Sequence, residues 1–197
     1  LYLPGPWLKE GENEIVVFEM EDTGHRTLCG LDKPILNVLG KDKNGRERKE
    51  RDNTKTPILD PGDMVLKASL EKKNGWQEFT FKRPVTMRHL CFEALSSYAD
   101  KFSCISEIEL LDEAGKSLPK DTWQIVYANT EQAGEGYAEQ MIDDDLSSYW
   151  HSQWSGNVTP FPHRVIVDLG EIQAVKGIRV RQRSASMAGC VKDFCLY

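Results

Sequence analysis

Short segments in which apolar and polar residues alternate fill the chain from Met64 to Tyr197, and this alternation predicts β-strands. Turn-forming or polar residues separate the segments. The predicted strands are Met64 to Leu70, Trp76 to Phe81, Arg88 to Ala94, Ile105 to Leu111, Trp123 to Tyr127, Arg164 to Leu169, Val175 to Gln182 and Val191 to Tyr197. The one helical candidate is a single turn at Ala138 to Ile142. The pattern predicts an all-β fold, an antiparallel β-sandwich of the jelly-roll kind.

The pattern is weaker before Pro61. Ile15 to Phe18 reads as a buried strand, whereas residues 20–60 contain one apolar stretch and a run of mixed charges between Lys41 and Lys55. A structureless stretch of this length is uncommon inside a compact domain, so we expect a linker or a surface-lying segment. The charge run is expected to be solvated.

The composition is that of an ordinary globular protein, with 197 residues, 40% hydrophobic and 28% charged. The net charge of −6 offers no attraction to phosphate backbones or anionic lipids, so neither nucleic acid nor a membrane is expected as a partner. No apolar run is long enough to span a bilayer. Because the chain begins at Leu1 rather than Met, we expect an excised fragment whose targeting signal would lie upstream.

The cysteines show neither the CxxC nor the Cys/His spacing of a metal site. They stand at Cys29, Cys91, Cys104, Cys190 and Cys195. Their odd number leaves at least one thiol outside any disulfide within a monomer. Burial as small hydrophobic side chains is the expected role for most of them, and Cys91 with Cys104 and Cys190 with Cys195 are conceivable pairs.

The residues from Tyr149 to Trp154 carry the most informative chemistry in the chain. One imidazole, His151, stands here among two indoles and a phenol. Aromatic rings offer a flat apolar surface to the C–H face of a sugar, and an imidazole offers a fixed polar group to a hydroxyl. The stretch therefore favours a sugar-binding loop on a β-sandwich. A buried Trp150 with polar neighbours on an ordinary turn is the alternative.

The stretch from Tyr127 to Tyr197 carries a set of motifs that resembles a known domain family. The motifs are Ile142-Asp143, Ser148-x-Trp150-His151, Val167-Asp168-Leu169-Gly170, Val175-Lys176-Gly177-Ile178 and Val191-Lys192-Asp193-Phe194. They are similar to the first half of the discoidin domain, also called the coagulation factor 5/8 type C domain and, in glycosidases, the family 32 carbohydrate-binding module. Trp76 to Leu111 looks like the second half of the same domain, through Phe79-x-Phe81, Arg88-x-Leu90 and Ser106 to Leu110. The resemblance implies a galactose-binding-domain-like sandwich.

The two halves stand in the opposite order from the family, which suggests a circular permutation. Asp112 to Thr122 would join the half that normally comes last to the half that normally comes first. A sandwich whose ends lie side by side can be relinked and reopened without losing core contacts. We therefore expect residues 61–197 to form one permuted discoidin-like domain. The alternative is two half-domains, each with open sheet edges.

The resemblance also implies residues for sugar binding. His151 corresponds to the imidazole that contacts a galactose-type hydroxyl, and Arg183 to the guanidinium beside it, whose planar donors suit two neighbouring hydroxyls. Ala188-Gly189 replaces the family's frequent Asn-Gly pair, so one sugar-contacting amide is missing. The predicted sugar-binding residues are His151, Arg183, Trp154, Tyr149, Gln153, Asn157, Tyr98 and Phe102. Trp150 is expected in the core.

A cluster of acids resembles the loop that many members of the family wrap around a structural Ca²⁺. The implied ligands are Asp143, Asp145, Ser148 and, from the closing strand, Glu107. Calcium takes about six to eight oxygen ligands, so clustered acids in a tight turn suit it chemically. Asp144 stands where the family usually has glycine. A plain acidic turn is the alternative, and no organic cofactor is expected.

The stretch from Leu1 to Glu19 is similar to the closing strands of family 35 β-galactosidases, which implies that residues 1–19 end a preceding domain with a catalytic barrel upstream. Together the resemblances imply a non-catalytic module that binds a galactose-type or other terminal sugar for a β-galactosidase-like glycoside hydrolase. They imply an extracellular or periplasmic location.

Three other functions stay open: a bracing domain that has lost sugar binding, a protein- or lipid-binding discoidin module using the loop from Thr159 to His163, and an enzyme. Catalysis is disfavoured because Glu107 and Glu109 stand two apart on one predicted strand. Their carboxyl groups would lie on one face of that strand rather than across a cleft.

Overall fold

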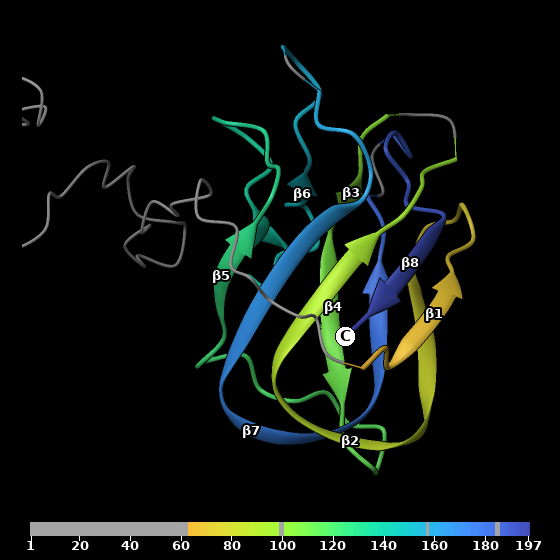
Figure 1. The fold of residues 1–197 in the computed structure, drawn as a ribbon, viewed down its shortest axis with the longest axis vertical. Helices are drawn as coiled ribbons and strands as arrows, with labels where there is room; N and C mark the ends of the chain where they lie inside the picture. The colour runs from red at the N-terminus through yellow and green to blue at the C-terminus, as the bar shows by residue number, and fades with distance from the viewer. Residues whose placement is uncertain (1–62, 99–100, 157, 184–185) are drawn as a thin grey trace, which may run out of the picture. The chain divides into compact units, whose positions relative to one another are not determined.

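A computed structural model describes residues 63–98, 101–156, 158–183 and 186–197, and the predictions for residues 1–19 and 20–60 fall outside this part. The strands are β1 (Leu66–Ser69), β2 (Trp76–Ala94), β3 (Cys104–Ile105), β4 (Glu107–Leu111), β5 (Gln124–Ala128), β6 (Trp150–His151), β7 (His163–Arg181) and β8 (Asp193–Leu196), with a 3₁₀ turn η2 at Ala138–Met141. These strands pair antiparallel with one another, so the predicted all-β sandwich class is confirmed (Figure 1).

Two long strands, β2 and β7, pair with each other along most of their length. Their register shifts between Thr80 and Val85 and again between Met87 and His89. Both ribbons turn over at the lower end of Figure 1. The sequence predicted two separate strands in place of each, because the polar residues at the bend resemble the turn between two strands.

Because β2 and β7 bend, the pair that they form takes part in both layers of the sandwich. The later part of β2 and the earlier part of β7 pair in the first layer, with β8 and β1 beyond β2 and β5 beyond β7. The earlier part of β2 and the later part of β7 pair in the second layer, where β4 continues the sheet. The two layers face each other because the strand pair folds back over itself.

The space between the layers is filled by one cluster of buried apolar side chains. Phe194 stacks on Phe92 of the first layer, with ring centroids 5.3 Å apart, and meets the ring edge of Phe79 from the second layer, also at 5.3 Å. Trp150 is fully buried in the same cluster, as predicted, and its Nε1–H donates to the Thr130 carbonyl at 3.1 Å. The stretches before and after Gly115 therefore share one sheet and one core.

The described cysteines Cys91, Cys104, Cys190 and Cys195 are all buried, which agrees with their expected role as small hydrophobic side chains. Neither conceivable disulfide, Cys91 with Cys104 or Cys190 with Cys195, is formed among the described residues. The part of the chain that the structure describes also contains no helix with the length and apolarity needed to cross a membrane.

Candidate functional site

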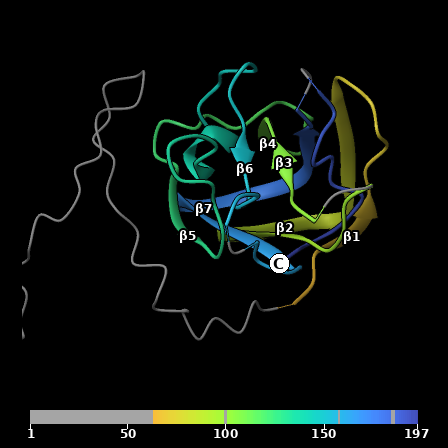
Figure 2. The ribbon, with the colours of Figure 1, turned by 90° about the horizontal axis from the view of Figure 1, so that it is seen from above.

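The short strand β6 places His151 at one end of the sandwich. β6 pairs with β3, so that His151 lies opposite Cys104 and Trp150 opposite Ile105 (Figure 2). The pairing continues past the strands, since the Ser103 N–H donates to Ser152 Oγ at 2.8 Å and the Ser152 N–H donates to the Ser103 carbonyl at 2.9 Å. Trp150 and His151 point to opposite sides of β6, as alternate strand residues do, so the core tryptophan fixes the histidine beside it.

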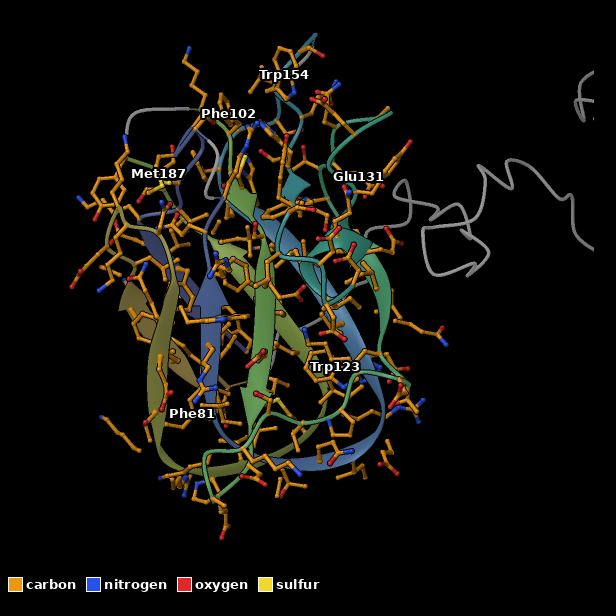
Figure 3. All side chains as sticks on the ribbon, turned by 180° about the vertical axis from the view of Figure 1, so that it is seen from behind. Phe81, Phe102, Trp123, Glu131, Trp154 and Met187 are labelled. Atoms are coloured by element: carbon orange, nitrogen blue, oxygen red, sulfur yellow. The ribbon has the colours of Figure 1, made fainter. Side chains whose placement is uncertain are left out.

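The His151 ring is packed among aromatic side chains from two segments. Its centroid lies 4.6 Å from that of Phe102, with the rings stacked, and 6.2 Å from those of both Tyr149 and Trp154. Figure 3 shows Phe102 and Trp154 at the end of the sandwich opposite Phe81 and Trp123. We call Phe102, Tyr149, His151 and Trp154, together with Arg183, the rim.

His151 lies at the bottom of the rim, which we call its floor, because only 3% of its surface is exposed. Its Nδ1 lies 2.6 Å from the Ser152 carbonyl, so this nitrogen carries the proton and donates it to the carbonyl oxygen. The ring orientation is therefore fixed by the backbone of the next residue. The exposed surface belongs to the residues around it.

Arg183 contributes the rim's guanidinium group, whose carbon lies 4.1 Å from the centre of the Tyr149 ring. This contact is a cation–π interaction. The Nε atom of Arg183 is enclosed and has no hydrogen-bond partner among the described residues. An enclosed donor without an acceptor is unfavourable by about 1–3 kcal/mol, so a ligand oxygen at this position would be stabilised.

Trp154 gives the rim its exposed flat surface, with 48% of the residue accessible to solvent. Its Nε1–H donates to Glu135 Oε1 at 2.9 Å, and its backbone N–H donates to Gln132 Oε1 at 3.1 Å. Both bonds hold the indole against the loop that precedes η2. The indole face is thus presented in a fixed orientation.

Two other predicted residues serve the local structure, and one cannot be placed. The Gln153 side-chain amide donates to the Ser155 carbonyl at 3.1 Å and so closes its own loop. Tyr98 is 41% exposed, and its hydroxyl donates to the Leu70 carbonyl at 2.9 Å, which directs it to the loop between β1 and β2. Asn157 lies outside the described residues.

The segment between β5 and η2 supports the rim and was not predicted as part of the site. The Gln132 N–H donates to the His151 carbonyl, and the His151 N–H donates to the Gly136 carbonyl, both at 2.8 Å. Glu135 and Gln132 also hold Trp154 by the bonds given above. The signal in the sequence was the pair of turn glycines around Glu135, which marked an irregular segment but not what it contacts.

The predicted calcium loop is closed by its own side chains. Ser148 Oγ lies 2.9 Å from both carboxylate oxygens of Asp143 and 3.0 Å from the Asp145 carbonyl. The Asp145 N–H donates to Asp143 Oδ1 at 2.9 Å. Asp144 has φ of 61°, the left-handed conformation that glycine favours, so the loop forms without the family's glycine.

Glu107, the fourth predicted ligand, faces a lysine. It is 1% exposed, and the ammonium group of Lys120 lies 2.8 Å from its Oε1 and 2.8 Å from Asp144 Oδ1. Burial raises the pKa of Glu107 to about 7, although Lys120 opposes this rise. The described residues contain no group of three or more His, Cys, Asp or Glu side chains placed to hold an ion.

This donor set does not fit a calcium ion as it stands, because an ammonium group already neutralises the buried carboxylate. Calcium binding itself stays a prediction from the sequence.

Comparison with known proteins gives two matches. Residues 125–197 match the family model of the F5/8 type C domain. A sialidase from Micromonospora viridifaciens is 31% identical over 91 residues, which are 46% of this chain and 13% of the sialidase. The match thus spans a small part of that protein's length.

Proposed function

We propose that the rim binds carbohydrate, a terminal galactose-type sugar, and that the described residues form a non-catalytic binding module. The observation that carries the proposal is the combination of an exposed indole, Trp154, which neighbours His151, with the enclosed and unpartnered Nε of Arg183, whose guanidinium group lies over Tyr149. A sugar needs an apolar face for its C–H groups and fixed donors for its hydroxyls. The rim offers both.

Each rim residue has a distinct part in this proposal. The Trp154 face packs on the sugar ring, the Arg183 guanidinium donates to adjacent hydroxyls, and His151 and Phe102 form the floor. A shallow site of this kind binds weakly, with Kd on the order of 1 mM, which corresponds to about −4 kcal/mol. Weak binding is useful when the module is tethered to a catalytic domain, because tethering raises the local concentration of substrate.

The comparisons support a carbohydrate ligand, since the F5/8 type C match covers Tyr149, His151, Trp154 and Arg183, and the relative is named a sialidase. We extend the proposal to the whole protein: the module serves an upstream glycoside hydrolase domain of the β-galactosidase type, outside the cytoplasm. We also propose that the chain order is a permutation of the discoidin order. The shared sheet of β2 and β7 supports this proposal, because it unites the two stretches that the permutation would exchange.

Two of the three rival functions, lipid or protein binding and catalysis, gain no specific observation. Phe161, at the loop proposed for lipid or protein contact, is partly buried and stacks one face of its ring on the buried His163, with ring centroids 4.1 Å apart. Glu109 accepts a hydrogen bond from Ser117 Oγ at 2.5 Å, and Glu107 faces Lys120. These two carboxylates serve local contacts of β4.

Titration with galactose, lactose and N-acetylgalactosamine, followed by NMR, tests the proposal. We expect saturable shifts of the Trp154 indole signal in the unmodified protein. Trp154→Ala and Arg183→Ala should each weaken binding at least tenfold, because each removes one required contact. Ile172→Ala is the matched control, since Ile172 is 70% exposed and lies at the bend of β7, away from the rim.

Two results would overturn sugar binding at the rim. One is the absence of saturable shifts with all three sugars, which would favour the bracing role. The other is binding that is equal in Trp154→Ala, Arg183→Ala and the control, which would place the sugar elsewhere.

A further inference from the structure

Lys120 is a charged residue that the fold nearly encloses. It lies in the connection between β4 and β5, and 7% of its surface is exposed. Its backbone carbonyl accepts a hydrogen bond from the Trp123 N–H at 3.0 Å, in the tight turn that leads to β5. An enclosed ammonium group needs a compensating charge.

Two carboxylates supply that charge from different parts of the chain. Glu107 Oε1 on β4 and Asp144 Oδ1 in the acidic loop each lie 2.8 Å from the ammonium nitrogen. The Glu107 carboxylate is itself buried, so it requires a cation to remain charged. Lys120 therefore joins the connecting segment, the closing strand and the acidic loop at one point.

The conformation of Asp144 is consistent with this role. A residue other than glycine adopts the left-handed region at some cost, and Asp tolerates it better than most. Here the carboxylate gained at this position reaches the ammonium group. The ion pair thus gives a physical reason for an aspartate where a glycine would fit the backbone more easily.

A divalent ion on Glu107 would face an unfavourable neighbour. Glu107 Oε2 is enclosed and has no hydrogen-bond partner among the described residues, so it is the oxygen that an ion would have to reach. The ammonium group already bonded to the other oxygen of this carboxylate would repel a second cation at that distance. The surroundings of Glu107 therefore do not favour the Lys120 ammonium group and a divalent cation together.

We propose that Lys120 is the built-in cation of this loop, and that residues 143–148 hold their conformation without calcium. This inference does not rest on the proposed sugar binding, because it concerns contacts on the side of the loop that faces β4. It makes the module's fold independent of the calcium concentration around it.

Thermal unfolding of the unmodified protein in calcium chloride and in EDTA tests the inference directly. We expect the same Tm in both solutions and no saturable heat when calcium chloride is titrated into the protein. A higher Tm in calcium, or a saturable binding isotherm, would overturn it.

Lys120→Met tests the contribution of the ammonium group, since methionine keeps most of the side-chain volume. We expect Tm to fall by about 10 °C, because the substitution leaves the buried Glu107 without its cation. Lys72→Met is the matched control: Lys72 is exposed, and its loss should leave Tm nearly unchanged. Equal Tm values for the two variants would show that Lys120 does not hold the loop.

Asp144→Asn gives a second arm that does not depend on Lys120→Met folding. Asparagine also tolerates the left-handed conformation, so the variant removes the charge and keeps the backbone. We expect a smaller fall in Tm than for Lys120→Met, because Asp144 is exposed while Glu107 is buried. A Tm equal to that of the unmodified protein would argue against the ion pair.

Discussion

The backbone of Gly136 lies against His151 more closely than any side chain would permit. A Cβ atom at Gly136 would stand 2.4 Å from His151 Cβ, and the residue has φ of 65°. Its carbonyl accepts the hydrogen bond from the His151 N–H. The position of His151, and with it the floor of the rim, depends on the absence of a side chain at this residue.

Gly136→Ala should therefore destabilise the protein more than Gly134→Ala. Gly134 also has a positive φ, of 87°, but no atom lies within 4 Å of the position its Cβ would take. Both variants carry the strain of a left-handed alanine, on the order of 1 kcal/mol. Gly136→Ala adds the clash, roughly 1–3 kcal/mol more. Urea unfolding measures both, and equal free energies of unfolding would refute the close contact.

His163 gives the protein a dependence of stability on pH. The residue is buried, its Nδ1 lies 2.9 Å from Ser103 Oγ, and its Nε2 lies 2.9 Å from the Thr159 carbonyl. A neutral imidazole ring satisfies both hydrogen bonds, since Nε2–H donates to the Thr159 carbonyl and Nδ1 accepts from the Ser103 hydroxyl. Burial lowers the pKa of His163 below its usual 6.5, although the bond to Thr159 opposes this.

The unfolded chain therefore binds a proton at His163 more readily than the folded protein. The stabilisation is complete above pH 6.5 and is lost as the pH falls below it. Protonation of Glu107, whose pKa is raised to about 7, stabilises the folded state over the same range, so the test compares two proteins. From pH 7 to pH 5 the free energy of unfolding in urea should fall more, or rise less, in the unmodified protein than in His163→Gln. His89→Gln is the control, because His89 is exposed; the same pH dependence in His163→Gln as in the unmodified protein would assign it to other groups.

At the scale of elements, the alternation of apolar residues predicted where strands lie but not where two of them are continuous. Gly170 resembled the end of a strand, yet it lies within β7 with φ of 84°. Its N–H donates to Asp168 Oδ1, and Thr122 occupies the space where its Cβ would be. These are contacts of a bend inside a strand, and they depend on Thr122, which is distant in the sequence.

In the site, too, residues that are neighbours in the sequence could be predicted, whereas contacts between distant segments could not. Tyr149, His151 and Trp154 are neighbours in the sequence, so a local motif sufficed to propose them together. The partners of Trp154, Gln132 and Glu135, approach only because another segment pairs with β6. Lys120 was missed for the same reason, since nothing near it in the sequence indicates Glu107 or Asp144 as its partners.

Loss of the Phe194 ring should destabilise the protein strongly, because this ring contacts Phe92 in one layer and Phe79 in the other. Phe194→Ala removes a fully buried ring and should lower the free energy of unfolding by about 3–5 kcal/mol. Ile172→Ala should change it by less than about 0.5 kcal/mol, since Ile172 is exposed. Chemical denaturation compares the two, and a small loss for Phe194→Ala would contradict the packing described.

At the scale of the whole molecule, the described residues are held together by pairing between distant stretches rather than by the segment that connects them. β4, before Gly115, pairs with β7, and β2 pairs with both β7 and β8. The turn at Asp112 is local, since the Asp112 carboxylate accepts from the N–H groups of Ala114 and Lys116. The chain could therefore be cut at this turn without removing a strand pairing.

A protease site inserted after Gly115 tests this expectation. After cleavage the two pieces should elute together in gel filtration and unfold in one transition, because β2, β4, β7 and β8 remain paired. The uncut insertion variant is the control for the insertion itself. Separation of the pieces without denaturant would mean that the covalent connection, and not the shared sheet, holds them.

Because β2 and β7 are continuous across the bend, the two layers of the sandwich are not independent sheets. In a protein made of two independent sheets, one sheet can slide or peel from the other while each stays intact. Here β2 and β7 each run through both layers of the sandwich, so the layers cannot separate while both strands stay intact. A mechanical force transmitted through a tethered polymer would therefore be resisted by both layers together, and we expect them to unfold in one step.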